Sequence, residues 1–355
     1  MEDGIVRYEN TEVAKVELYL LNDIVVNARS SNFIQNNKVV IERIPSIESQ
    51  YCNYATGLVL AHDSNFALVK NSKNAIELDV ETAIFLGGNG SWNYYHWMIE
   101  ILPKIQFLKE ANILSLTDNI IVSKSVETTD SFMKTLKQAL QDVKINLIFL
   151  EPNEAYRVKN LYVVSAPNNI LFNSKKIVTS PNYIFFRMES LEYVRNLVLS
   201  MMKDYNQDRL SNILAALKNK NSKLNIFLAR KKGSARDYNQ DEVWRLIEQE
   251  CDIIQIYMED YSIEEQAFIF SNADLIIGAS GAAWTNLMFC KKDAVAISWV
   301  PKHLKDFSAY STLAEYYGVK NYFIEVEPSN EKELHSSYKV PLDKLKIVIN
   351  QRTKQ

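Results

Sequence analysis

The chain has 355 residues, a length that suits two domains, and 47% of them are hydrophobic against 23% charged. Lys and Arg number 40 and Asp and Glu 43, so the net charge of −3 lacks the basic excess of a dedicated nucleic-acid-binding protein. Three widely spaced cysteines form no C-x-x-C pair, which excludes the patterns typical of a disulfide framework or a zinc site. The first residues, MEDGIVRYEN, lack the apolar core of a signal peptide, and no stretch reaches the ~20 apolar residues of a membrane span. We therefore expect a soluble, cytoplasmic protein that binds no nucleic acid and makes at most peripheral membrane contact.

The first eighty residues predict short β-strands, rich in β-branched residues and separated by Asn, Asp and Ser clusters. The expected strands are 13–21, 38–44, 56–61 and 75–80. From residue 82 strands and helices alternate, which is the pattern of a parallel sheet. The expected elements are strand 82–86, a glycine loop at 87–90, helix 91–111, strand 119–125, helix 129–142, strands 145–150 and 156–166, and a largely helical stretch at 182–218.

The second half of the sequence alternates more regularly. The expected elements are strand 223–229, helix 241–250, strand 251–258, helix 262–270, strand 273–278, a short helix, and strand 293–299. Ser262 with Glu265 matches a capping box, and Asn239 with Glu242 is its Asn equivalent.

Two doubly wound halves that face each other would form a cleft at the carboxyl ends of both sheets. We therefore predict an α/β fold with two Rossmann-like domains around a central cleft. The N-terminal domain, 1–205, has a β-rich start, and the C-terminal domain covers 206–330. A strand or helix tail, 331–355, could pack back on the N-terminal domain.

The sequence G-A-S-G-A-A-W-T-N at 278–286 carries a buried strand into a tight glycine turn, with a helix starting near Ala283. Glycines let the backbone approach a ligand closely, and free N–H groups at a helix start suit a diphosphate. The alternative is a strand-to-helix turn that needs its glycines for geometry alone. The candidate binding residues are Gly278, Ser280, Gly281, Ala282, Thr285 and Asn286.

A basic run, A-R-K-K-G-S-A-R at 229–236, directly follows the strand 223–229. The guanidinium fork of Arg230 or Arg236 can bind a diphosphate at two points and stabilise the charge on a departing nucleotide. Lys231 and Lys232 add positive charge. The alternative is a solvated basic loop.

The helix sequence N-Y-Y-H-W-M-I-E-I-L-P-K at 93–104 places Asn93, His96, Glu100 and Lys104 on one narrow stripe. His96 and Glu100, four residues apart, could form a hydrogen-bonded pair that raises the basicity of the imidazole. Pro103 should kink or divide the helix near Ile99. The alternative is a polar helix face in water.

The sequence contains no D-x-D motif of the kind that holds a divalent ion on a nucleotide sugar. The remaining histidines, His62, His303 and His335, have no partner at metal-ligand spacing. We therefore expect no metal and no cofactor, with Arg, Lys and helix N-termini meeting the charge of a leaving group.

In this order the three segments resemble the family-61 glycosyltransferases, known in bacteria from capsular polysaccharide gene clusters. The helix segment resembles the family's N-x-x-H-W-x-x-E-x-L-P-[RK], and R-K-K-G-S-A-R-D-Y-N resembles its Arg-spacer-Arg-x-x-Asn block. Residues 262–289 resemble its E-Q-x(n)-G-x-H-G-A-x-x-T-N segment, and the resemblance covers about residues 82–300. The family often has His where this chain has Ser280, and Gly where it has Ala283, so Ser280 would offer only a neutral hydrogen bond.

The resemblance implies a GT-B fold with a nucleotide-sugar-binding C-terminal domain. It also implies inverting, metal-independent transfer of a hexosyl or pentosyl group from a nucleotide sugar, commonly a UDP-sugar, to a glycan or lipid-linked glycan. His96 would be the general base, Glu100 would orient it, and Arg230, Lys231 and Arg236 would bind the diphosphate. On the acceptor side we expect Asn89, Asn93 and Trp97. Two alternatives remain open: a sugar-nucleotide epimerase of the same architecture, and a non-catalytic scaffold for polysaccharide assembly.

Overall fold

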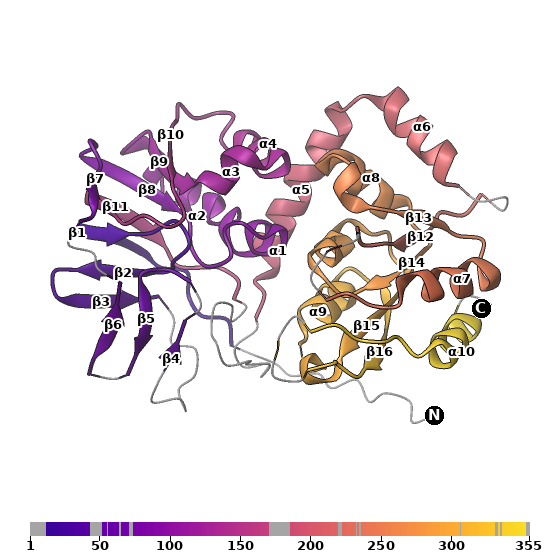
Figure 1. The fold of residues 1–355 in the computed structure, drawn as a ribbon. Helices are drawn as coiled ribbons and strands as arrows, with labels where there is room; N and C mark the ends of the chain where they lie inside the picture. Colours follow the sequence, from indigo (N-terminus) through magenta and orange to yellow (C-terminus); the bar gives the residue numbers. More distant parts are fainter. Residues whose placement is uncertain are drawn as a thin grey trace.

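The protein has an α/β fold with two large β-sheets, one in each half of the molecule (Figure 1). The computed structural model describes residues 12–42, 52–54, 56–63, 65–70, 74–169, 185–218, 222–231, 233, 236–305, 307–330, 333 and 336–352. The predictions for 43–44, 182–184, Lys232 and His335 lie outside these residues.

The first sheet has the order β10-β9-β8-β11-β1-β2-β3, with β7 beside β11, among the described residues. Its strands are β1 Leu18–Val26, β2 Asn32–Gln35, β3 Lys38–Ile41, β7 Ile76–Glu77, β8 Thr82–Leu86, β9 Asn119–Ser123, β10 Asn146–Leu150 and β11 Tyr156–Val164. Strands β10, β9, β8 and β11 are parallel, whereas β1, β2 and β3 continue the sheet in antiparallel pairs. The neighbours of β8 are β9 and β11, so chain order reverses there and a crevice is expected at the carboxyl ends of β8 and β11.

The first sheet curls back over itself. Ile24 and Phe33 of β1 and β2 share a buried core with Phe85 and Ile121 of β8 and β9, and the Phe33 and Phe85 rings meet edge to face at 5.4 Å. This explains why the strand expected at 13–21 instead runs from Leu18 to Val26: its second half holds the buried residues. A separate antiparallel sheet contains β4 Cys52–Asn53, β5 Val59–His62 and β6 Ala67–Val69.

The helix expected at 91–111 is divided by Pro103, as predicted. The segments are α1 Tyr94–His96, a π-helical turn η1 Trp97–Ile101, and α2 Lys104–Glu110. Pro103 has no N–H to donate to the carbonyl of Ile99. The buried side chain of Asn168 supplies this hydrogen bond instead, with Nδ2 2.6 Å from the Ile99 oxygen. The other helices here are η2 Ile113–Ser115, α3 Lys124–Thr128 and α4 Asp130–Ala139.

The second sheet is parallel throughout, with the order β13-β12-β14-β15-β16 among the described residues. Its elements are β12 Asn225–Leu228, α7 Gln240–Glu250, β13 Ile254–Ile256, η4 Met258–Asp260, α8 Ile263–Asn272, β14 Leu275–Ala279, η5 Ala282–Phe289, β15 Val295–Pro301, η6 Lys302–Leu304, α9 Ala309–Tyr316 and β16 Lys320–Val326. Alternate residues of its strands pack into two different cores, one on each face of the sheet, and helices cover both faces. The switch point lies between β12 and β14, where a ligand site is expected beyond the strands' carboxyl ends.

Three details of the second half test the predicted helix starts. The Ser262–Glu265 capping box is present with both hydrogen bonds. Asn239 does precede α7, but its side chain caps nothing there; it donates to Glu242 and accepts from the Val340 N–H at 2.8 Å, so the Asn version of the box was wrong. The helix after Gly281 is a 3-10 helix, whose first amides also lack partners inside the helix.

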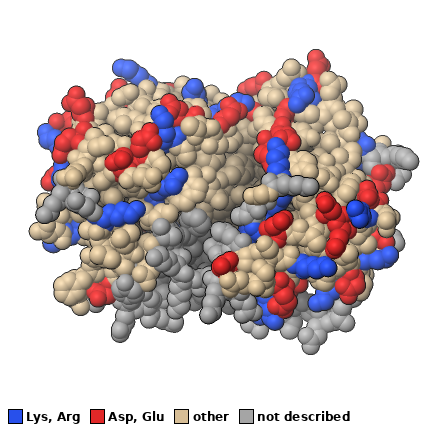
Figure 2. Space-filling model, in the orientation of Figure 1, with Lys and Arg blue, Asp and Glu red and all other residues tan. Residues whose placement is uncertain are grey.

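Helix α5 (Met188–Asp204) lies between the two halves, followed by α6 (Gln207–Leu217) (Figure 1). One continuous core joins residues of both sheets through α1, α5, α8 and η5. The surface is hollowed between the halves, and most of the visible lining carries neither Lys and Arg nor Asp and Glu (Figure 2). None of the helices in the described part of the chain combines the length and apolar composition of a bilayer span.

The C-terminal helix α10 (Leu342–Arg352) packs against α7 and β16. Val340, Leu345 and Ile349 are fully buried in the core that covers this outer face of the second sheet. The tail therefore lies on the second half and not, as the sequence had allowed, on the first.

Candidate active site

His96 and Glu100 form a buried hydrogen-bonded pair at the start of the divided helix. The imidazole Nδ1 faces the Glu100 carboxylate, and the two residues are 4% and 7% exposed. Lys104, on the same stripe, is also buried. The alternative of a water-facing polar stripe is therefore wrong: the π-turn and the packing of both helix faces carry these groups inside.

The glycine loop that follows β8 lies directly on the His96 ring. A methyl group added at Gly90 would come within 2.4 Å of the imidazole Cγ, and Gly90 has φ +75°, in the left-handed region that favours glycine. Asn93 caps α1, with Oδ1 2.9 Å from the Tyr95 N–H. Asn89 is held by Ser31, whose N–H donates to Asn89 Oδ1 at 3.3 Å. Both asparagines thus position the loop that holds His96.

Two arginines meet at the glycine turn of the second sheet. Arg230 Nη2 donates to the Ser280 carbonyl at 2.6 Å, and Nη1 donates to the Arg236 carbonyl at 3.0 Å. A Cβ at Gly281 would lie 3.1 Å from Arg230 Nη2 and 3.6 Å from Arg236 Nη2, so both guanidinium groups face this glycine. Burial, reinforced by the positive charge of Arg230, lowers the pKa of Arg236. Among the described residues the buried Nε of Arg236 has no acceptor. Two cations held together in this way favour an anionic ligand.

Gln240, which the sequence did not single out, fixes the position of Arg230. Its Oε1 accepts from the Arg230 N–H at 2.7 Å, and its Nε2 donates to the Arg230 carbonyl at 2.9 Å. The first residue of α7 thus fixes the backbone at the carboxyl end of β12.

A pair of tyrosines connects the His96–Glu100 pair with the two arginines. Tyr95, next to His96, meets Tyr310 of α9 edge to face, with ring centroids 5.7 Å apart. Burial raises the pKa of Tyr310, whereas the nearby charges of Arg236 and Arg230 act in the opposite direction. Because α1 also contacts η5, the His96 pair and the arginine pair belong to one region between the halves. No sequence motif marks Tyr310, since it lies far along the chain from both.

Three predicted ligand residues also hold the structure together or are buried in it. Gly278 lets β12 and β14 approach, because a Cβ there would lie 2.8 Å from Leu228 Cβ. Asn286 is fully buried; it accepts from the Tyr94 hydroxyl at 2.6 Å and donates to Gln266 Oε1 at 3.0 Å, joining α1 to the second half. Thr285 is also fully buried within η5.

Three further residues that were predicted to bind the ligand lie at or near the glycine turn or in the basic run. Ser280 contributes its carbonyl to Arg230, and Ala282 starts η5 half-buried against the central core. Lys231 is exposed and points to Asp260, with Nζ 2.5 Å from Oδ1.

The acceptor-side prediction for Trp97 was wrong. Its indole is fully buried, stacks on Phe132 at 5.0 Å, and donates from Nε1 to Thr135 Oγ1 at 3.0 Å. It is part of the core and cannot contact an acceptor.

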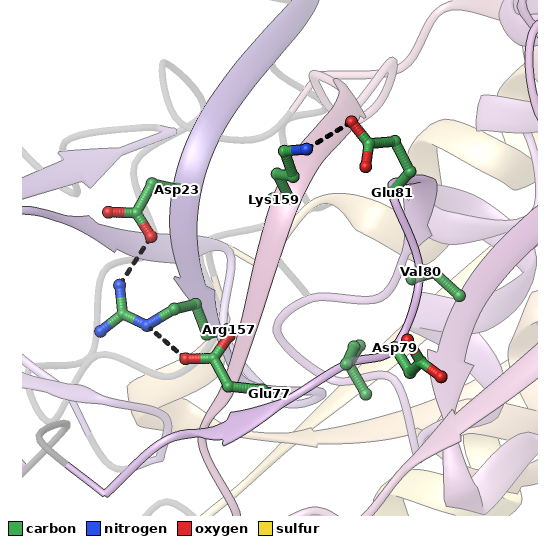
Figure 3. Close-up of a pocket in the computed structure, with 8 residues that line it drawn as sticks. Asp23, Glu77, Asp79, Val80, Glu81, Arg157 and Lys159 are labelled. Atoms are coloured by element: carbon green, nitrogen blue, oxygen red, sulfur yellow. Dashed lines mark hydrogen bonds and ion pairs between the residues drawn. The ribbon is translucent and has the colours of Figure 1, made fainter.

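A depression of about 670 Å³ lies at the amino end of β8, away from the glycine loop at its carboxyl end (Figure 3). Arg157 bridges Asp23 at 2.8 Å and Glu77 at 3.0 Å, and Lys159 holds Glu81 at 2.6 Å. With Asp79 the lining has four carboxylates against these two cations, and this excess of negative charge does not favour an anionic ligand. Nowhere in the described residues are three His, Cys, Asp or Glu side chains grouped as metal ligands would be, and a metal-free site stays a prediction.

The comparison with protein families agrees with the geometry. The family model of glycosyltransferase 61 matches residues 94–297, more than half of the chain. The matched part contains His96, Glu100, Arg230, Arg236 and Gly281. A search of curated proteins finds no relative that matches the chain. The chain therefore belongs to the glycosyltransferase 61 family and is an enzyme that transfers a sugar from a sugar donor to a glycan acceptor.

Proposed function

We propose that the protein is an inverting, metal-independent glycosyltransferase. It would move a hexose or pentose from a nucleotide sugar, commonly a UDP-sugar, to a glycan acceptor in surface polysaccharide biosynthesis. Membership of a glycosyltransferase family supports transfer over the two alternatives, sugar-nucleotide epimerisation and a non-catalytic assembly role.

One observation carries the donor assignment: Arg230 and Arg236 converge on Gly281 at the switch point of a parallel sheet. Backbone and guanidinium donors together match the oxygens of a diphosphate. Both arginines would neutralise the charge on the departing nucleotide. Because negative charge grows on the diphosphate as the bond to the sugar breaks, the two arginines would bind the donor and stabilise the transition state still more, which raises the rate.

The acceptor hydroxyl would attack the anomeric carbon in line with the diphosphate. The new C–O bond forms as the bond to the diphosphate oxygen breaks, and the hydroxyl proton passes to His96. Glu100, bonded to Nδ1, fixes the tautomer that presents Nε2 as the base and stabilises the imidazolium that results.

We further propose a GT-B arrangement, with domains 1–205 and 206–330. Two observations support this arrangement. Each half has its own sheet, and the switch point of each sheet lies beside one part of the site: the His96 pair in the first half and the arginine pair in the second. The tail from 331 would belong to the second domain, because α10 packs there.

The decisive experiment is a calorimetric titration of UDP, GDP, CDP and CMP. One nucleotide should bind the wild type, and Arg230→Met and Arg236→Met should each weaken it by about tenfold or more. Lys231→Met is the matched control, since its ammonium pairs with Asp260, and it should change affinity by much less. Unchanged affinity in both arginine variants would contradict the donor site. NMR of the product anomer then reports inversion or retention.

A further inference from the structure

A second cationic group lies beside the His96 loop, in the turn between β1 and β2. Arg29 lies over the ring of Trp92, with its Cζ 4.6 Å from the ring centroid. Both residues are partly exposed. Arg29 donates from none of its side-chain nitrogens to any described residue, forms no ion pair among them, and keeps its Nε buried without an acceptor. A guanidinium without acceptors is unusual, because its five N–H groups are strong donors.

Hydrogen bonds tie the residue before Arg29 to the glycine loop that follows β8 and to Ser91 beside it. The Ala28 carbonyl accepts from the Gly88 N–H at 3.3 Å and from the Ser91 hydroxyl at 3.0 Å. Arg29 itself donates from its N–H to Asn27 Oδ1 at 2.9 Å. Gly90, in the same loop, lies against His96. Arg29 and Trp92 therefore belong to the first half and border the glycine loop that lies against the proposed base.

Stacking and hydrogen bonding use different parts of a guanidinium. A cation over the face of an aromatic ring is attracted to the ring and gives up no N–H group to that contact. Trp92, whose ring centroid lies 4.6 Å from Arg29 Cζ, therefore holds the guanidinium without using its donors. The planar fork of a guanidinium suits two oxygens of one anionic group.

We propose that Arg29 binds an oxyanion on the acceptor, either the carboxylate of an acidic sugar or a phosphate ester, and that Trp92 positions it. That the bound anion belongs to an acceptor rests on the proposed function, whereas the anion site itself does not depend on it. A neutral sugar hydroxyl would satisfy the fork only weakly, so the site selects charged acceptors.

The test is a set of ligand-observed NMR titrations with three small probes in the presence of saturating nucleotide. Methyl glucuronide carries a carboxylate, glucose 6-phosphate a phosphate, and methyl glucoside neither. At least one charged probe should bind about tenfold or more tightly than methyl glucoside. A carboxylate preference identifies an acidic sugar, and a phosphate preference identifies a phosphorylated acceptor.

Arg29→Gln should remove this preference, and Arg29→Lys should restore only part of it, because an ammonium lacks the planar fork. Arg157→Gln is the matched control, since it removes a guanidinium at the amino end of β8. Equal binding of all three probes to the wild type, or a preference that survives in Arg29→Gln, would overturn the proposal. Nucleotide calorimetry separates this anion site from the proposed donor site, because nucleotide affinity should depend on Arg230 and not on Arg29.

Discussion

Gly278 lies in strand β14 and Gly281 three residues later, in the turn before η5, and the two glycines have different neighbours. Neither has a φ in the left-handed region that favours glycine, and Gly281 is fully extended at φ 177°, so alanine fits the backbone at both positions. What differs is the neighbour. At Gly278 the new methyl would lie 2.8 Å from Leu228 Cβ and 3.0 Å from the Leu228 carbonyl, in the middle of the sheet. At Gly281 it would lie 3.1 Å from Arg230 Nη2, the end of a long side chain.

Gly278→Ala should therefore lower the free energy of unfolding by about 1–3 kcal/mol, the usual cost of overpacking. Gly281→Ala should change it by no more than about 0.5 kcal/mol, because the arginine side chains can move. The displaced Arg230 would weaken its bond to the Ser280 carbonyl and its hold on the ligand. Nucleotide affinity should then fall about tenfold, equivalent to about 1.4 kcal/mol.

Urea denaturation and nucleotide calorimetry on the two variants check this pair. Each variant serves as the control for the other, since both add one methyl group within the same short segment of the chain. If Gly281→Ala unfolded as readily as Gly278→Ala, or bound nucleotide as tightly as the wild type, the reasoning about the turn would be refuted.

Three other predictions follow. His96→Ala should lower kcat by about 10²–10⁴ while nucleotide affinity stays constant, and near-normal turnover would remove the base assignment. Trp97→Phe should cost about 1–3 kcal/mol of stability and leave the acceptor KM unchanged; a raised KM at unchanged stability would restore an acceptor role. Burial alone would raise the pKa of Glu265, but hydrogen bonds from Arg209 and the Ser262 N–H outweigh it and lower the pKa below 4.5. Its stabilisation is therefore full above pH 4.5 and lost as the pH falls through the lowered value. Glu265→Gln should cost about 1 kcal/mol at pH 7 in urea denaturation, and the gap should close in acid; a gap independent of pH would refute the charge argument.

Local signals in the sequence predicted the parts of the site that depend on spacing. Glu100 lies four positions after His96, and this spacing alone predicted their pairing. Strand-end positions predicted that Arg230 and Gly281 would meet, because the carboxyl ends of neighbouring parallel strands lie together. The capping box at Ser262 was predicted for the same reason: its bonds span three residues.

Contacts between distant segments could not be predicted. Tyr310 reaches Tyr95 only because α9 and α1 both pack on η5. Periodicity placed Trp97 on a helix, but it could not tell that both faces of that helix are covered. The curl of the first sheet likewise depends on packing between β2 and β8, which no single segment encodes.

The central placement of β8 has a consequence for fragment design. The segment shared with the family starts at residue 94, after β8, and stops at 297, within β15. A polypeptide trimmed to those limits would lose the middle strand β8 together with β1, β2, β3 and β7 of the first sheet. It would also lose the edge strand β16 of the second sheet and the buried Leu345 and Ile349 of α10. Such a fragment would expose apolar surface on both sides, and we expect it to aggregate on expression rather than fold.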